Sequence, residues 1–234
     1  MRWATFGVVL LALLTLVVVS AIVRLPDRSS LESASKFSNE IRIVHETTPL
    51  PPCRREVVPA TYQRVASIRG VDFRNFKYPG VHGCDFDVPT EPFQVRRGQY
   101  GDWHDGLKFR GVSFGDVSGD NRDEAVVSFA GESDGSGRRD AVYVFALEQN
   151  RPKAIYVFES GDRADGGLRR AYVEKGRFVL ELWGPGNTLE KSGATDGTGL
   201  CCPKTFTRSY YQWRNGAFER QSFEILPNPE FSSE

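Results

Sequence analysis

Short runs of aromatic and β-branched residues, separated by clusters of turn-forming residues, follow one another along most of the chain. Residues 141–147 and 153–159 flank one such cluster, and residues 168–173 and 178–183 flank another. Two runs of this kind around a short polar turn predict a β-hairpin. In the last run, the large apolar side chains at 178, 180 and 182 alternate with Val and Glu181, so this strand has one inward face.

The clearest hairpin lies near the C-terminus, where residues 206–213 lead through Asn215-Gly216 into residues 217–225. Asn-Gly supplies the two positive-φ positions of a type I′ turn. No segment beyond the N-terminus has helical periodicity. The pattern predicts an all-β fold, in which antiparallel hairpins and meanders form a small β domain that is either blade-like or a sandwich. Earlier strands are expected at 71–78, 93–97 and 107–117.

The N-terminus differs from the rest, because residues 3–23 carry no charge and predict a hydrophobic helix. A run of about 20 apolar residues matches the thickness of a bilayer core, which favours an uncleaved anchor. Val19-Ser20-Ala21 is an acceptable small-residue cleavage site, which favours a signal peptide. Both interpretations stay open. Basic residues flank the run on both sides, so the positive-inside rule assigns no orientation.

The composition then divides the chain into four parts. Residues 1–23 are the signal peptide or membrane anchor, and residues 24–60 form a polar, proline-containing linker. Residues 61–227 form the β-rich globular domain, and residues 228–234 form a tail. Inside the domain, two glycine-rich segments are expected to be solvated surface connectors, at 131–139 and 184–199.

The four cysteines, Cys53, Cys84, Cys201 and Cys202, predict disulfide bonds if the domain is exported. Four cysteines allow three pairings, and the sequence does not choose among them. A zinc site is the alternative, but no Cys-x-x-Cys pair is present and the three histidines are scattered. We therefore expect bridges that involve Cys53 and Cys84.

The charges are balanced, since Lys plus Arg and Asp plus Glu each number 30. A chain without net charge has no overall field that attracts nucleic acid, so no nucleic-acid partner is expected. The expected partners are the membrane, through residues 1–23 if they are not cleaved, and an unidentified protein or glycan ligand.

An acidic turn at residues 116–124 carries the most specific chemistry of the chain. Oxygen-bearing side chains occupy its first, third, fifth and ninth positions, and this spacing lets a tight loop wrap around a hard cation. The candidate metal ligands for calcium are Asp116, Ser118, Asp120 and Glu124. Ser118 is a neutral ligand and Arg122 compensates part of the negative charge, so any calcium affinity is expected to be weak.

Residues 114–127, Phe-Gly-Asp-Val-Ser-Gly-Asp-Asn-Arg-Asp-Glu-Ala-Val-Val, resemble the Asp-rich loop of FG-GAP and VCBS-type repeats of integrin-like β-propellers. Ser118 stands where those repeats prefer Asp or Asn. Asn121 stands where they usually have Gly, although Asn tolerates a left-handed conformation. The resemblance implies a strand, a calcium-holding turn and a hydrophobic strand. With one loop and too few residues for four blades, it implies a single blade-like unit.

Further segments widen the resemblance to exported bacterial proteins that carry one such loop. They are Val71–Pro79, Ser160–Leu168, Cys201–Pro203 and Tyr211–Gly216. This resemblance implies a fold and an extracytoplasmic location, in the bacterial periplasm or at the cell surface, either membrane-anchored or secreted. It implies no reaction.

Catalytic motifs are scarce, because the sequence has no Gly-x-Ser-x-Gly elbow, no phosphate-binding loop and no His-Glu-x-x-His. His104 beside Asp105 is a base candidate, for which a turn is the simpler account. Asp162 and Asp165 are the candidate carboxylates of a hydrolase, for which an ion-paired turn is the alternative. The sequence therefore favours a non-catalytic exported β domain, with an envelope carbohydrate or peptide hydrolase as the alternative. Three aromatic residues are interpreted either as sugar-stacking or as core side chains: Trp183, Tyr210 and Tyr211.

Overall fold

The computed structural model describes residues 42–45, 56–82, 88–102, 104–133, 139–161, 166–191 and 203–231. These residues belong to one compact unit of the chain, Asn39–Glu234. Most of them are in antiparallel strands, and the helices among them are two single 3₁₀ turns, η2 (Ile68–Gly70) and η3 (Phe73–Asn75). The all-β, antiparallel prediction is confirmed. Within the part of the chain that the structure describes, no helix has the length and apolar character needed to cross a membrane.

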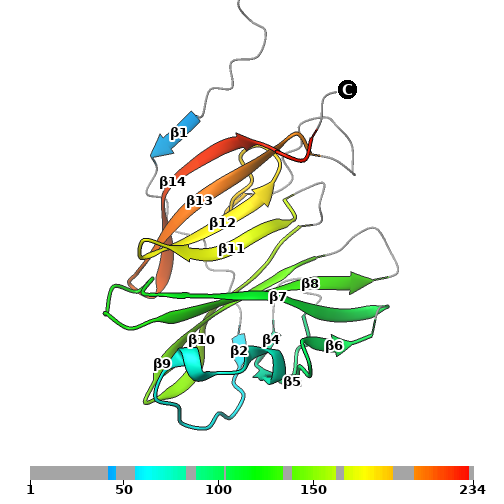
Figure 1. The fold of residues 1–234 in the computed structure, drawn as a ribbon, viewed down its shortest axis with the longest axis vertical. Helices are drawn as coiled ribbons and strands as arrows, with labels where there is room; N and C mark the ends of the chain where they lie inside the picture. The colour runs from blue at the N-terminus through cyan, green and yellow to red at the C-terminus, as the bar shows by residue number, and fades with distance from the viewer. Residues whose placement is uncertain are drawn as a thin grey trace, which may run out of the picture. The chain divides into compact units, whose positions relative to one another are not determined.

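Two four-stranded meanders follow one another in the sequence (Figure 1). The first contains β7 (Asp105–Gly115), β8 (Glu124–Ser133), β9 (Ala141–Glu148) and β10 (Arg151–Glu159), and the second contains β11 (Leu168–Glu174), β12 (Arg177–Trp183), β13 (Thr205–Arg214) and β14 (Ala217–Pro227). Short strands extend each sheet: β6 (Gln99–Gly101) pairs with β7, and β1 (Arg42–His45) pairs with β14. Two small ladders complete the fold, β2 (Glu56–Val58) with β4 (Gly80–His82) and β3 (Lys77–Tyr78) with β5 (Phe93–Gln94).

The hairpins form because their turn residues accept positive φ. Asn215 and Gly216 have φ values of 50° and 82°, as the predicted type I′ turn requires. The β9–β10 turn places Gln149 and Asn150 at 52° and 62°. Type I′ turns follow the right-handed twist of their strands, so each meander continues without a long connection.

The central strands of the first sheet, β8 and β9, are buried on both faces. Ala125, Val127 and Phe129 of β8 point into one core cluster, whereas Val126 between them belongs to the other. Successive side chains of a strand point to opposite faces, so a strand covered on both sides is apolar at nearly every position. This is why β8 and β9 show no apolar and polar alternation.

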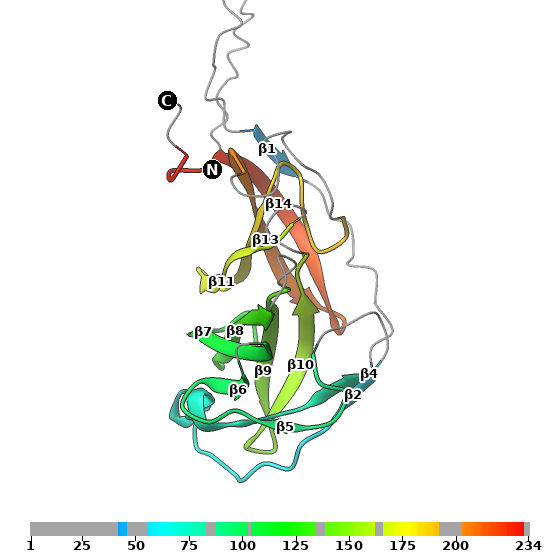
Figure 2. The ribbon, with the colours of Figure 1, turned by 90° about the vertical axis from the view of Figure 1, so that its right-hand side faces the viewer.

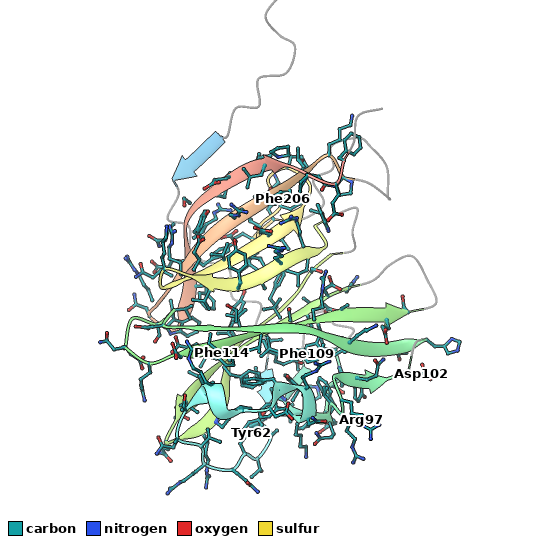
Figure 3. All side chains as sticks on the ribbon, in the orientation of Figure 1. Tyr62, Arg97, Asp102, Phe109, Phe114 and Phe206 are labelled. Atoms are coloured by element: carbon teal, nitrogen blue, oxygen red, sulfur yellow. The ribbon has the colours of Figure 1, made fainter. Side chains whose placement is uncertain are left out.

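Two different layers cover those faces. Residues 57–82 and 88–100 pack on one side with Ile68, Phe73 and Tyr78, and the second meander packs on the other with Phe178 and Leu180. Figures 1 and 2 show the first meander between these two layers. In Figure 3 the labelled rings of the first core lie beside the short strands: Tyr62, Phe109 and Phe114.

The strand expected at residues 71–78 is mostly absent, and this prediction is wrong. The Asp72 carboxylate accepts hydrogen bonds from the Arg74 backbone N–H at 3.1 Å and from the Asn75 amide at 2.8 Å. This side-chain cap favours the 3₁₀ turn η3 over an extended strand. Only Lys77–Tyr78 of that segment are a strand.

The expected linker and one expected loop also differ from the structure. Arg42–His45 and Glu56–Val58 lie inside the segment predicted as a linker, yet both pair as short strands. In the second glycine-rich segment, Asn187 and Thr188 are buried rather than solvated. The Asn187 amide donates to the Trp183 carbonyl at 2.6 Å, which holds this connection against the sheet.

Candidate functional site

The acidic loop between β7 and β8 is closed by its own backbone. Asp116 carboxylate oxygens accept hydrogen bonds from the N–H groups of Gly119 at 2.6 Å and Asn121 at 2.9 Å. Asn121 has a φ of 63°, the left-handed conformation that Asn tolerates better than most residues. Asp120 accepts from the Arg122 N–H at 2.9 Å and pairs with the Arg122 guanidinium at 2.5 Å. Each of these two carboxylates therefore has donors within the loop.

Glu124, the last candidate ligand, is buried at the start of β8 with 2% of its surface exposed. Its carboxylate accepts from the backbone N–H of Val117 at 2.8 Å and from the Ser118 hydroxyl at 2.9 Å. Burial raises the pKa of Glu124, and these hydrogen bonds oppose the shift. Ser118 and Glu124 thus bond to each other across the base of the loop.

These contacts fit a self-contained turn better than a cation cage. Among the described ranges, no group of three or more His, Cys, Asp or Glu side chains is placed to hold a metal ion. The Arg122 guanidinium pairs with Asp120 and so compensates part of the negative charge of the loop. Calcium binding by Asp116, Ser118, Asp120 and Glu124 stays a prediction.

We expect any calcium bound by this loop to have a dissociation constant on the order of 0.1–1 mM. Millimolar calcium would then raise the free energy of unfolding by about 1 kcal/mol or less. Asp120→Ala should abolish that rise and also lower the metal-free melting temperature, because the Arg122 N–H loses its acceptor. Thermal melts in calcium and in chelator check both effects.

Asp120→Asn is the matched control, because its amide oxygen still accepts the Arg122 N–H while the negative charge is removed. A calcium-dependent rise in wild type that vanishes in Asp120→Asn supports a metal site. Identical wild-type melts with and without calcium would contradict it and leave the loop as a structural turn.

The other predicted candidates do not assemble a reactive centre in the described residues. The Asp102 carboxylate accepts from the backbone N–H groups of His104 at 2.9 Å and Asp105 at 3.2 Å, which is the turn expected there. The His104 hydrogen bond, followed by that of Asp105, lowers the pKa of Asp102. Asp162 and Asp165 lie outside the described residues, as do all four cysteines.

The aromatic candidates are structural. Tyr211 is fully buried and stacks at a tilt on Phe178, with ring centroids 5.8 Å apart. Tyr210 is also buried, and Trp183 lies beneath the Arg169 guanidinium at 5.6 Å from its ring centroid. The core interpretation holds for Tyr210 and Tyr211, whereas Trp183 is only partly buried.

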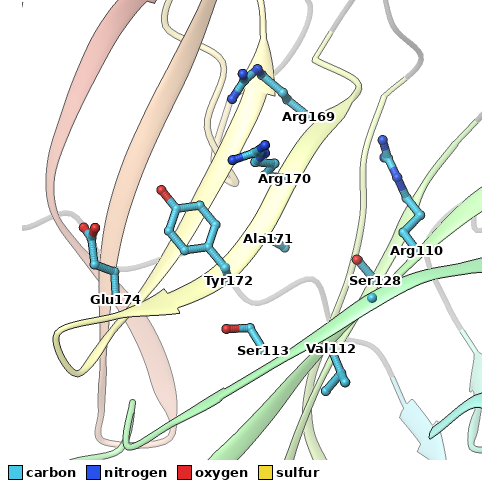
Figure 4. A pocket seen from close by; sticks show the side chains of 10 residues that line it. Arg110, Val112, Ser113, Ser128, Arg169, Arg170, Ala171, Tyr172 and Glu174 are labelled. Atoms are coloured by element: carbon cyan, nitrogen blue, oxygen red, sulfur yellow. The ribbon is translucent and has the colours of Figure 1, made fainter.

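The site that the sequence did not predict is a polar pocket between β7 and β11, with a volume of about 570 Å³ (Figure 4). This volume falls in the range of roughly 300–1,000 Å³ of small-molecule sites. Two hydrogen bonds join the strands across it, because Arg110 donates to the Leu168 carbonyl at 3.0 Å and the Ser113 hydroxyl accepts from the Val173 N–H at 3.0 Å. The lining comes from Arg110, Gly111, Val112 and Ser113 of β7, Ser128 of β8, and Arg169, Arg170, Ala171, Tyr172 and Glu174 of β11.

Two β-bulges place arginines in this pocket. The β7–β8 register passes from Phe109 to Gly111 and leaves Arg110 as the extra residue. The β11–β12 register passes from Leu168 to Arg170 and leaves Arg169 as the extra residue. A bulge re-aims a side chain that a regular strand would point elsewhere, and bulges are frequent beside functional sites.

Ion pairs hold two of the arginines in place. Arg110 pairs with Asp140 at 2.7 Å, and Arg169 pairs with Glu181, whose side chain is 1% exposed. Glu181 also pairs with Arg208 at 2.8 Å. Two guanidinium groups therefore share one carboxylate, which leaves an excess of positive charge beside the pocket.

Two further polar side chains of the lining differ in how they are paired. Arg170 is exposed, and its side chain makes no hydrogen bond or ion pair with another of the described residues. The Tyr172 hydroxyl donates to the Glu181 carboxylate at 3.3 Å, and burial, followed by the charge of Glu181, raises the pKa of Tyr172 to about 12. The arrangement can bind and orient an anion, but it contains no nucleophile paired with a base.

Sequence reasoning missed this site because a bulge leaves no periodic signal. The only local sign is the Arg169-Arg170 pair at the start of a predicted strand, where two adjacent like charges conflict with a regular alternation. Arg110, the other arginine on a bulge, lies 59 positions before Arg169 in the sequence. Only the packing of β7 beside β11 brings both into one pocket.

The fold and the site define a class: a two-meander, antiparallel β protein with an arginine-lined pocket between its sheets. Comparison with known proteins finds no matching family model, no significantly similar curated protein and no significantly similar solved structure. The likeness to FG-GAP and VCBS-type loops therefore rests on the residues of the loop alone.

Proposed function

We propose that the protein is a non-catalytic binding module of the bacterial envelope, exported and either anchored through residues 1–23 or released. The observation that carries the proposal is the pocket between β7 and β11, because two bulges and two ion pairs orient its arginines in advance of any ligand. Preorganised donors of this kind lower the entropic cost of binding. The ligand is a protein or a glycan, and nucleic acid is not a partner.

The proposal includes a blade-like description of the fold. Each meander has four antiparallel strands in sequence order, and the acidic loop joins the first two strands of the first meander. That placement is the one that the FG-GAP and VCBS resemblance implies. It supports one blade-like unit, the first meander, within the β domain.

Location and function are tested on the full chain. A reporter that is active only after export, fused after Glu234, should be active, while a cytoplasm-only reporter should be silent. The reverse pattern would contradict an extracytoplasmic location.

If the protein binds a ligand without catalysis, a cross-linker in the pocket should capture the ligand and no reaction product should form. A photo-cross-linking amino acid at Val112, which lines the pocket, should capture an envelope component, whereas the same group at the exposed Arg64 position should not. Incubation with envelope polysaccharide and peptidoglycan should release no new reducing ends or peptides. Release of either product would favour the hydrolase alternative.

A further inference from the structure

We infer that the pocket between β7 and β11 binds an acidic saccharide, with the acid group held by its arginine end. The inference deepens the proposed function and rests on it. Three guanidinium groups line the pocket, from Arg110, Arg169 and Arg170, and Figure 4 shows Glu174 at the other end. The pocket is therefore cationic at one end and acidic at the other.

The charge state of the arginine end selects an anion. Asp140 and Glu181 pair with Arg110 and Arg169, while Arg170 has no such partner among the described residues. Glu181 is also paired with Arg208, so four guanidinium groups stand against two carboxylates and leave two positive charges in excess beside this end. A carboxylate, sulfate or phosphate can take two parallel N–H donors from one guanidinium, which is the strongest polar contact available there.

The other end selects hydroxyl groups. A carboxylate such as Glu174 is an acceptor only, so it repels a second anionic group and accepts hydrogen bonds from hydroxyls. Ser113 and Ser128 each offer a hydroxyl on the β7 and β8 side of the pocket, and the Tyr172 ring belongs to the β11 side. A saccharide with one acid group and several hydroxyls matches this sequence of groups, whereas a free inorganic anion uses only one end.

The backbone argues against an extended peptide as the ligand. Strand addition requires free N–H and C=O groups along an edge. On β11, the Leu168 carbonyl already accepts from Arg110, and the Val173 N–H already donates to Ser113. Residues of β7 therefore already occupy the β11 edge at Leu168 and at Val173. The few residues between these two positions are too short a stretch for a regular ladder of hydrogen bonds to a peptide strand.

The probe is tri-galacturonate, with neutral trigalactose, inorganic sulfate and a hexaglutamate peptide as comparisons, each titrated into the full chain by calorimetry. Tri-galacturonate should bind at least about ten-fold more tightly than the other three probes. Its affinity should fall as salt increases, because the arginine end is open to solvent.

Two variants locate the site. Arg170→Gln should weaken tri-galacturonate binding by about ten-fold, the loss of one charge-assisted pair. Gly111→Asp should abolish it, since a side chain at Gly111 meets no protein atom within 4 Å and so projects a carboxylate into the pocket. Arg64→Gln, the same charge change at an exposed position outside the pocket, should leave binding unchanged. Melting curves of all three variants establish that they fold.

The relative binding of the four probes shows which part of the inference fails. Equal binding of sulfate and tri-galacturonate would mean a simple anion site, and preferential binding of hexaglutamate would mean a peptide site. Binding of neutral trigalactose that Gly111→Asp abolishes would overturn the acidic class but keep the binding role. Cleavage of a saccharide would instead overturn the proposed function.

Discussion

Replacing Glu181 with glutamine should lower the free energy of unfolding by about 3 kcal/mol, because it leaves two guanidinium groups without their shared charge. The Glu181 side chain is 1% exposed, whereas those of Arg169 and Arg208 are 15% and 29% exposed. Partial hydration of the two arginines places the expected loss at the lower end of the range for broken buried pairs. Chemical denaturation of wild type and variant measures it.

The control is Glu148→Gln, the same chemical change in an exposed pair. Glu148 and Lys153 are 2.8 Å apart, but their side chains are 63% and 54% exposed. Pairs of this kind contribute roughly 0–1 kcal/mol, so the control should lose little. Equal losses in both variants would contradict the structural role of the Glu181 cluster.

The Glu181 variant also connects stability to the pocket. Arg169 lies over the Phe206 ring at 4.2 Å from its centroid and is held there by Glu181. Without that carboxylate, Arg169 loses the ion pair that fixes its guanidinium beside β12 and β13. We therefore expect the variant to bind anions less selectively under conditions in which it remains folded, as titrations below its melting temperature would measure.

Gly80→Ala should destabilise the protein by about 3 kcal/mol, the upper end of ordinary overpacking. An added Cβ would overlap the Thr90 carbonyl and lie 2.6 Å from the Glu91 carbonyl carbon. Both neighbours are backbone atoms, so a rotamer change cannot relieve the clash. The segment must move as a whole, and this disturbs Val81 and Val88, which are buried in the first core cluster.

Gly70→Ala is the matched control, because an added Cβ there meets nothing within 4 Å and the φ of Gly70 is not positive. It should be neutral or stabilise by about 0.4–1 kcal/mol through the entropy of the unfolded chain. Thermal and denaturant melts of both alanine variants provide the comparison. A Gly80→Ala protein as stable as Gly70→Ala would show that residues 88–91 adjust freely.

Local features of the sequence were predictable because they depend on neighbouring residues. The Asn215-Gly216 turn follows from two residues that accept positive φ, and the hairpin strands follow from short β-branched and aromatic runs on either side of turn clusters. The 3₁₀ turn at Phe73–Asn75 was equally local, since Asp72 caps it, but the aromatic residues around it favoured a strand.

By itself, then, the sequence determined an all-β chain of hairpins, with the left-handed Asn121 in its acidic turn. Only the tertiary structure decided that the first meander is covered on both faces, because that depends on which layers pack against it. The pocket between β7 and β11 also depends on the tertiary structure. A bulge shifts a register by one residue, and whether Arg110 and Arg169 then line one pocket depends on β7 and β11 meeting across the fold.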